Sequence, residues 1–337
     1  MLSEQIEQDT RDNDEIKHLR AELKALRSKH VDAAKLLESI VAIHPGDMKV
    51  PRWMAAKPSR KAHHATPVLM LSDLHLDEVV NLRDMHGMNE YNREIAEARL
   101  SRTVDFTVEY LKQYATGLHF DGIVVALLGD IITGVIHAEL AETNEAPVPA
   151  TIVHWVPKLA SAIRYLADSL GTVHVPCVDG NHDRTTDKTR MKKRAESSYA
   201  WVVYNWLADS LRDDDRITFS ISPSSDQILD IYTTKFLLVH GDGFRGGGGV
   251  GGIYPPMLKY LHRQHAMWAA VNQPWDYCLM GHWHSLMWGQ NFVVNGSLKG
   301  YDEYARRNGF GFEKARQALF ICTPERGITT QTAVYCD

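Results

Sequence analysis

Acidic and histidine side chains follow five apolar segments of this sequence, each directly after the segment ends. The five groups are Asp73-Leu74-His75, Gly129-Asp130, Asp179-Gly180-Asn181-His182-Asp183, His240-Gly241-Asp242 and Gly281-His282-Trp283-His284. Carboxylate, amide oxygen and imidazole are the ligands that hard and borderline divalent metals take up in proteins. The chain also has 17 histidines in 337 residues, and histidine is the commonest metal ligand. The pattern therefore indicates metal-dependent chemistry with oxygen and nitrogen ligands.

The apolar segments that precede these groups predict β-strands. They are residues 67–72, 123–128, 173–178, 235–239 and 276–280, and similar runs lie at 291–295 and 317–322. Helical patterns near residues 92–116, 150–170, 195–211 and 254–272 lie between several of them. Continuous apolar strands alternating with helices are typical of an α/β architecture whose sheet is covered on both faces. In open α/β sheets ligands bind beyond the carboxyl ends of the strands, so we expect the five groups to meet there.

A single histidine or Gly-Asp pair after a strand is usually structural, but the five groups in this order form a recognisable set. Together they resemble the signature of the calcineurin-like metallophosphoesterase superfamily, D-x-H, G-D, G-N-H-D/E, H and G-H-x-H. The resemblance spans residues 67 to about 300, and every ligand position is filled. It implies an α/β fold, a four-layer α-β-β-α metallophosphoesterase sandwich, and two divalent metal ions. Manganese is the expected metal, and iron, zinc and magnesium are alternatives.

The resemblance also assigns roles to individual residues. The first ion would be held by Asp73, His75 and His284, Asp130 would bridge both ions, and the second would be held by Asn181, His240 and His282. A hydroxide between the ions would attack phosphorus in line, because a metal lowers the pKa of bound water to about 7. His182 would stabilise or protonate the leaving oxygen, and Asp183 would orient His182.

The substrate is open to more than one interpretation. In the protein-phosphatase branch an arginine that binds phosphate follows shortly after Gly-Asp. This chain reads Gly129-Asp130-Ile131-Ile132-Thr133-Gly134 and lacks that arginine. Arg184 is a possible replacement. Six basic residues with one acid between them follow the third group: Arg184, Lys188, Arg190, Lys192, Lys193 and Arg194. They form either a solvated loop or a strip that contacts a polyanion, because lysine and arginine neutralise the phosphates of nucleic acids.

Three stretches, residues 130–144, 179–184 and 294–304, resemble bacteriophage-encoded members of the superfamily, which are usually described as metallophosphoesterases or as repair-exonuclease-like. His137 and Glu139 either line a groove or belong to a polar turn. Our first hypothesis is a phosphodiesterase acting on nucleic acid, a nuclease. The alternatives are a hydrolase of a small nucleotide or phosphomonoester, and a non-catalytic oligomeric module that binds nucleic acid.

The N-terminal 45 residues predict a separate amphipathic helix. Apolar and weakly apolar residues repeat with the 3-4 spacing of a heptad seam from Ile16 to Ile40, and such a seam needs a partner. It either packs on its own domain or forms a coiled coil that makes the protein a homo-oligomer. Residues 46–66 have the composition of a basic linker, in which Trp53 would offer a stacking ring, and residues 67–337 would form the metallophosphoesterase domain.

Composition excludes several other classes. The net charge of −5, from 37 basic and 42 acidic residues, rules out a polycation, although a local basic patch can still act. No uncharged apolar stretch is long enough to cross a membrane, and the first residues are acidic where a secretion signal would be basic. Four scattered cysteines without a CxxC pair argue against disulfides and predict a cytoplasmic protein, in the host cytoplasm if phage-encoded. Residues 241–246 match G-x-G-x-x-G, but a glycine-rich sequence broken only by Val250 continues to 252. It predicts a loop that is either a lid or a close backbone approach rather than a dinucleotide site.

Overall fold

The larger sheet of the computed structural model, which describes residues 51–55, 63–246 and 252–337, has seven strands. They are β1 (His63–Leu71), β2 (Leu118–Phe120), β3 (Gly122–Leu128), β4 (Thr172–Val178), β5 (Ile217–Ile221), β11 (Arg316–Thr323) and β12 (Gly327–Tyr335). Their order is β12-β11-β1-β3-β4-β5, with β2 paired to β1. Strands β1, β3, β4 and β5 run parallel, while β11 is antiparallel to β1 and to β12. The carboxyl ends of β1, β3 and β4 therefore lie side by side.

The smaller sheet has five strands in the order β6-β7-β8-β10-β9. They are β6 (Asp226–Ile231), β7 (Thr234–Val239), β8 (Tyr277–Met280), β9 (Met287–Trp288) and β10 (Phe292–Val294). Strands β7, β8 and β10 are parallel, so the groups that follow β7 and β8 also emerge at one edge.

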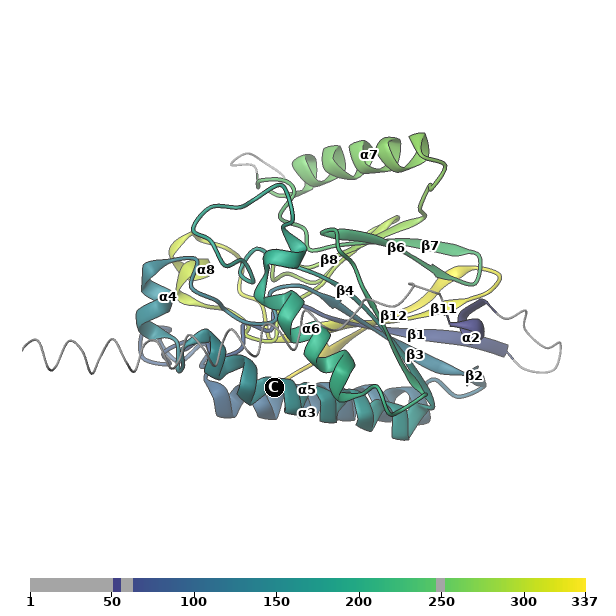
Figure 1. The fold of residues 1–337 in the computed structure, drawn as a ribbon, viewed down its shortest axis with the longest axis horizontal. Coiled ribbons are helices and arrows are strands. Elements are labelled where there is room, and N and C mark those ends of the chain that lie inside the picture. The colour runs from purple at the N-terminus through teal and green to yellow at the C-terminus, as the bar shows by residue number, and fades with distance from the viewer. Residues whose placement is uncertain (1–50, 56–62, 247–251) are drawn as a thin grey trace, which may run out of the picture. The chain divides into compact units, whose positions relative to one another are not determined.

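Helices cover the outer face of each sheet (Figure 1). On the larger sheet these are α3 (Arg93–Glu109), which continues into the π-helical turn Tyr110–Tyr114, α5 (Val148–Leu170) and α6 (Tyr199–Ser210). The smaller sheet is covered by α7 (Tyr254–Ala270). The short elements are α2 (Arg52–Ala55), α4 (Ala138–Thr143), the 3₁₀ turn Ala195–Ser197 and α8 (Glu303–Arg307).

Local sequence explains where the long helices begin and end and which of their faces is apolar. Asn92 caps α3 by accepting a hydrogen bond from the backbone N–H of Ile95 at 2.9 Å, which satisfies one of the free amides at the helix start. Helix α5 ends at Gly171, whose φ of 98° suits glycine. Its buried positions recur every three or four residues, as in Ile152, Trp155, Leu159 and Ile163, and this spacing makes one apolar stripe.

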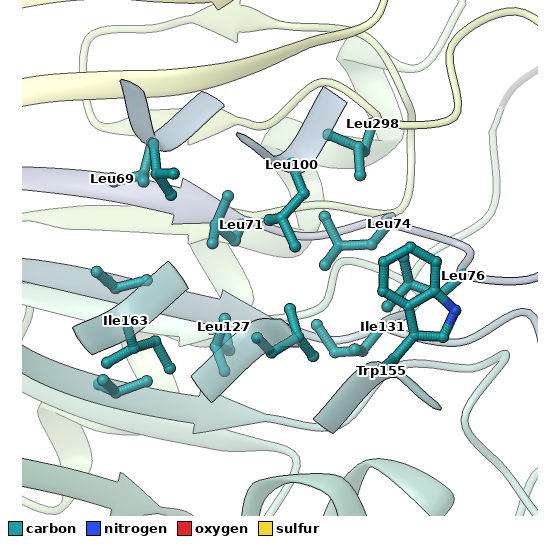
Figure 2. Packing of buried hydrophobic residues seen from close by; sticks show 14 of the residues in the cluster. Leu69, Leu71, Leu74, Leu76, Leu100, Leu127, Ile131, Trp155, Ile163 and Leu298 are labelled. Atoms are coloured by element: carbon teal, nitrogen blue, oxygen red, sulfur yellow. The ribbon is translucent and has the colours of Figure 1, made fainter. Parts of the chain in front are cut away.

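The central strands are apolar on both faces because each face meets a different core. In β1, Leu69 and Leu71 face the helices, whereas Val68 and Met70 face the smaller sheet. Figure 2 shows Leu69, Leu71 and Leu127 from the strands packed with Trp155 and Ile163 of α5. A third cluster lies between the smaller sheet and α7. The predicted four-layer α-β-β-α arrangement is thus confirmed, and all described residues belong to one compact unit.

The seven strands expected from apolar runs and the four long helices are all present, with some differences in extent. Strands β2, β5, β6, β9 and β12 were not predicted. Strands β2 and β9 have only three and two residues, β6 alternates between buried and half-buried residues, and β5 and β12 are mostly half-buried or exposed. Strand β1 begins at His63, inside the range expected to be linker. Trp53 in α2 packs against the core between the sheets rather than offering an exposed stacking ring.

The predicted helix of residues 1–45, most of the predicted linker and residues 247–251 of the glycine-rich segment lie outside the described residues. In the part of the chain that is described, no helix combines the length and apolar character needed to cross a membrane.

Candidate metal centre

The five polar groups converge at the carboxyl ends of the parallel strands. Asp73 and His75 follow β1, Asp130 follows β3, and the Asp179–Asp183 group follows β4 in the larger sheet. From the smaller sheet, His240 follows β7 and the Gly281–His284 group follows β8. Strand direction and order in the two sheets therefore bring together side chains that are up to about 210 residues apart in the chain, as the 3.0 Å contact of His75 with His284 shows.

Seven side chains expected to hold metal lie in two overlapping groups. In the first, the Nε2 atoms of His75 and His284 are 3.0 Å apart, and His284 Nε2 is 3.4 Å from Asp73 Oδ1. In the second, His240 Nε2 lies 3.1 Å from Asp130 Oδ2 and 3.0 Å from Asn181 Oδ1. The ligand atoms of Asp130, His240 and His282 all lie within 4.8 Å of one another.

Asp130 lies between the two groups. Its Oδ2 is 3.9 Å from His75 Nε2 in the first group and 3.1 Å from His240 Nε2 in the second. Both Asp73 and Asp130 are buried, with exposed fractions of 0% and 1%. A buried carboxylate placed between two sets of imidazoles has the position that a bridging ligand of a dinuclear site would need.

The backbone at the site is held in an unfavourable conformation. Asp73, His75, Asp130, His282 and His284 have φ between +46° and +69°, the left-handed region. This region costs an L-residue on the order of 1–2 kcal/mol, and such residues concentrate at functional sites because the surrounding structure must hold them there. Half of the described non-glycine residues with positive φ are thus expected metal ligands.

Two glycines make the close approach of the loops possible. Gly129 has φ +83°, and a Cβ there would overlap the backbone of Gly180. A Cβ on Gly180 would in turn overlap the backbone N and carboxylate of Asp130. Side chains at these positions would separate the loops after β3 and β4 and move Asp130 away from Asn181.

Burial and charge set the protonation of the imidazoles. Burial lowers the pKa of His182 to about 3 and that of His282 to about 4. Burial acts in the same direction on His240, but the carboxylates of Asp130 and Asp73 outweigh it and raise its pKa to about 10. In the absence of metal, His240 therefore supplies the positive charge that balances Asp130. Cations at this place would take over that role and release the His240 proton, because a metal binds neutral imidazole.

The donor set fits divalent metal ions. It consists of carboxylate, amide oxygen and imidazole without thiolate, which suits manganese, iron, zinc or magnesium. The buried Nδ1 of His75 makes no hydrogen bond but is 3.3 Å from Glu78 Oε2. A carboxylate on the far nitrogen of an imidazole is the usual arrangement around metal-bound histidine.

His182 lies at the same site and is held by the loop after β3. Its Nδ1 is 2.9 Å from the carbonyl oxygen of Thr133, so we place the proton on Nδ1, which leaves Nε2 free. Its backbone N–H donates to Asp130 Oδ1 at 2.7 Å, and its ring centroid is 4.6 Å from that of His75. His137, a possible groove residue, lies 6.5 Å from His182 between ring centroids.

Asp183 does not orient His182, contrary to expectation. Its Oδ2 accepts hydrogen bonds from the backbone N–H groups of Asp130 at 2.8 Å and Gly180 at 2.9 Å. Burial, followed by the charge of Asp130, raises the pKa of Asp183 to about 7. The carboxyl group of Asp183 thus fastens the loops that carry Asp130 and Asn181, while Thr133 orients the His182 ring.

The basic strip divides into two parts. Arg194 is paired with Asp179 at 2.8 Å and Asp242 at 2.9 Å, and Arg184 donates to the carbonyl oxygens of Asn181 and Thr186. Both arginines therefore hold loops at the site rather than a free anion, which corrects the expectation for them. The four remaining basic residues are exposed: Lys188, Arg190, Lys192 and Lys193.

Sequence reasoning missed a buried ion network beside His75. Lys299 Nζ lies 2.7 Å from Glu78 Oε1 and 2.5 Å from Asp302 Oδ2. Glu78 also accepts a hydrogen bond from Thr133 Oγ1 at 3.2 Å. No local motif signals this network, because Lys299 and Glu78 are 221 residues apart.

A second missed network holds Asp73. Ser72 Oγ lies 2.5 Å from Asp73 Oδ2 and accepts a hydrogen bond from Asn295 at 3.0 Å. Asn295 also donates to Gln317 at 2.8 Å. Asn295-Gly296-Ser297 matches the N-x-S pattern of a glycosylation site. Asn295 is fully buried, however, and its side chain serves this hydrogen-bond network instead.

Comparison with known proteins gave structural similarities only. No family model matches the chain, and no curated protein matches its sequence. A conserved uncharacterized protein from Streptococcus pneumoniae TIGR4, described as a predicted phosphoesterase, is similar at 11% identity over 80% of this chain and 98% of that chain, with a TM-score of 0.29. Zinc-complexed wild-type Vps29 from Entamoeba histolytica is similar at 14% identity over 80% of this chain and 99% of that chain, with a TM-score of 0.29. A single mutant of the same Vps29 gives 16% identity, coverages of 80% and 98%, and a TM-score of 0.30.

Proposed function

We propose that this protein is a metal-dependent phosphodiesterase with a dinuclear centre, acting on nucleic acid. The observation that carries the proposal is the gathering of seven ligand-type side chains into two groups, with Asp130 between them at 3.9 Å from His75 and 3.1 Å from His240, and with His182 beside them. This is the arrangement that the resemblance to calcineurin-like metallophosphoesterases implies. Two divalent ions bound there would polarise the phosphoryl oxygens and activate water for in-line displacement.

The chain's own residues position the reaction. Asp73, His75 and His284 form one half of the cradle, and the strained backbone keeps these side chains directed at one point. Asp130, anchored through its backbone N–H by Asp183, keeps the two halves at a fixed separation. Because the ligand side chains are already in place, they need not be rearranged as charge develops in the transition state. Such preorganisation is usually the largest contribution to electrostatic stabilisation of a transition state.

His182 is the residue that we propose acts on the leaving oxygen. It is neutral in the free protein, because burial lowers its pKa to about 3. A bound phosphate would favour the imidazolium form, since an opposite charge nearby stabilises the charged state. The carbonyl of Thr133 fixes Nδ1, so Nε2 is the nitrogen that can take up the proton and give it to the leaving group.

The nucleic-acid substrate is supported by the four exposed cations of the 188–193 segment, which begins a few residues after His182. They provide contacts to neighbouring phosphates of a polymer, and such contacts weaken as salt concentration rises. A small nucleotide would need the metal cradle but not this segment. Salt dependence thus separates the two substrate classes.

The test compares four substrates in one Mn²⁺ buffer: single-stranded DNA, double-stranded DNA, bis(p-nitrophenyl) phosphate and p-nitrophenyl phosphate. We expect cleavage of DNA and of the diester by the wild type, and its loss in His182→Ala. His262→Ala, an exposed position on α7, is the matched control and should keep full activity. Hydrolysis of the small diester with intact DNA would move the proposal to a small-nucleotide substrate, and no hydrolysis of any substrate would refute it.

We also propose that residues 1–45 join subunits into a homo-oligomer. The heptad spacing from Ile16 to Ile40 supports this proposal. Removing residues 1–45 should lower the mass measured by light scattering while hydrolysis of the small diester continues. An unchanged oligomer after truncation would contradict it.

A further inference from the structure

Three metal-ligating side chains meet at the opposite end of β1 from the candidate metal centre. His64 lies near the start of β1, His119 lies in β2, and Asp121 follows β2 directly. The two strands are parallel, and their register places His64 beside His119. Leu71 is seven positions after His64, so this end of the strand is about 23 Å from its carboxyl end at about 3.3 Å per residue.

The three side chains form a compact donor set. The two oxygens of Asp121 each contact one imidazole, with Oδ2 2.8 Å from His64 Nδ1 and Oδ1 3.2 Å from His119 Nε2. All three ligand atoms lie within 4.8 Å of one another, and the histidine rings meet edge to face with centroids 4.9 Å apart.

These separations are close to those of a metal site. Bonds of about 2.0–2.1 Å to a tetrahedral zinc ion place ligand atoms roughly 3.4 Å apart. The contacts to Asp121, at 2.8 Å from His64 and 3.2 Å from His119, need to lengthen by about 0.6 Å and about 0.2 Å. His119 has the freedom to turn toward an ion because its side chain is 57% exposed. The side chains of His64 and Asp121 are 17% and 34% exposed, so both remain accessible to a metal ion.

We propose that His64, His119 and Asp121 bind a transition-metal ion of the zinc, nickel or copper class at a site separate from the candidate metal centre. Two imidazoles and a carboxylate suit these metals better than magnesium or calcium, and affinity rises along the first-row series toward copper. With three protein ligands the site leaves a position for water.

The role that the geometry supports for this ion is structural. Strand β2 has only three residues, and its pairing partner among the described strands is β1. A metal bonded to His64 on β1 and to His119 on β2 would fasten this short strand, because binding to the folded form alone stabilises it. The reaction at the candidate metal centre would not depend on the ion.

The test counts zinc ions on the full-length chain, purified without a histidine tag and stripped with EDTA. After addition of Zn²⁺ and removal of the excess, atomic emission should give one zinc fewer per chain in His119→Ala than in the wild type. His86→Ala, on a surface loop, is the matched control and should keep the wild-type number. The difference of one ion is expected whether or not the candidate metal centre loads, so this result is independent of the proposed function.

Two further measurements make the outcome decisive. Asp121→Asn keeps the size of the side chain and should lose the same ion, which guards against misfolding of the alanine variant. Hydrogen exchange at residues 118–120 should slow when zinc is added to the wild type and remain unchanged in Asp121→Asn. Equal zinc numbers in the wild type, His119→Ala and Asp121→Asn would overturn the proposal and leave the three residues as a hydrogen-bonded cluster.

Discussion

Replacement of Lys299 by methionine should destabilise the protein strongly, because it leaves two carboxylates buried without their cation. The Lys299 side chain is 4% exposed, and its partners Glu78 and Asp302 are 10% and 7% exposed. Methionine keeps most of the length and the apolar stem of lysine, so the change removes charge rather than volume.

The magnitude follows from the contact distances. Coulomb's law with an effective dielectric constant of about 20 gives roughly 6 kcal/mol of attraction for charges 2.7 Å apart, the distance from Lys299 Nζ to Glu78 Oε1. Desolvation of the buried ions offsets much of this attraction. Removing one partner of a buried pair typically costs about 3–5 kcal/mol, and we expect a loss in this range for Lys299→Met.

The assay is guanidinium unfolding in EDTA, so that metal binding does not contribute to the free energy of unfolding. Lys158→Met is the matched control, because Lys158 is 2.8 Å from Glu97 but the two side chains are 36% and 38% exposed. An exposed pair contributes at most about 1 kcal/mol. A second variant, Lys299→Met with Glu78→Gln, should be more stable than Lys299→Met alone, since it removes one uncompensated charge.

Two results would refute this reasoning. One is a loss below about 1 kcal/mol for Lys299→Met, equal to that of the control. The other is a double variant no more stable than the single one, which would mean that Glu78 and Lys299 do not interact energetically.

Three further outcomes are expected. Asp130→Asn should lose bound metal and reduce hydrolysis of bis(p-nitrophenyl) phosphate by at least about 100-fold, because both ligand groups share this carboxylate; metal analysis with wild-type metal content would contradict it. His182→Ala should keep the metal content of the wild type and lower kcat by about 10²–10⁴, as expected for loss of a proton donor; a loss of metal instead would make His182 a ligand. Burial lowers the pKa of His174 to about 4 from its usual 6.5, so its contribution to stability is complete above pH 6.5 and is lost as the pH falls toward 4, by at most about 3 kcal/mol. Guanidinium unfolding at pH 4.5 and 7.5 should therefore show a smaller pH difference in His174→Gln than in the wild type, and equal differences would show that His174 does not carry this effect.

The interior of the fold was predictable from the sequence, whereas its edges were not. Strands such as β3 and β4 are buried on both faces, so they read as continuous apolar runs of strand length. The edge strand β6 alternates between buried and half-buried residues, and the edge strand β12 is mostly half-buried or exposed. Strand β2, with three residues, is too short to leave a pattern.

The sequence predicted those residues of the candidate site that lie just after the carboxyl end of a parallel strand, because parallel strands end at the same edge of a sheet. Asp73, Asp130 and His240 each come directly after a parallel strand, and the structure brings them to one place. Their binding of metal stays a prediction. Asp183 shows the limit of this reasoning: it is adjacent to His182 in the chain, yet in the turn its carboxyl group meets the backbone of Asp130 and Gly180 instead.

The sequence by itself determined which residues could do chemistry and that they follow strands, because hydrophobic patterning and turn residues are local properties. Only the tertiary structure decided which charges are satisfied and which are free. Arg194 looks like its exposed neighbours in sequence, but it is held by Asp179 and Asp242 from different strand ends. Lys299 meets Glu78, and His64 meets Asp121, across 221 and 57 residues. Such pairs form because sheet order brings distant segments together, and no local pattern encodes the energy of that contact.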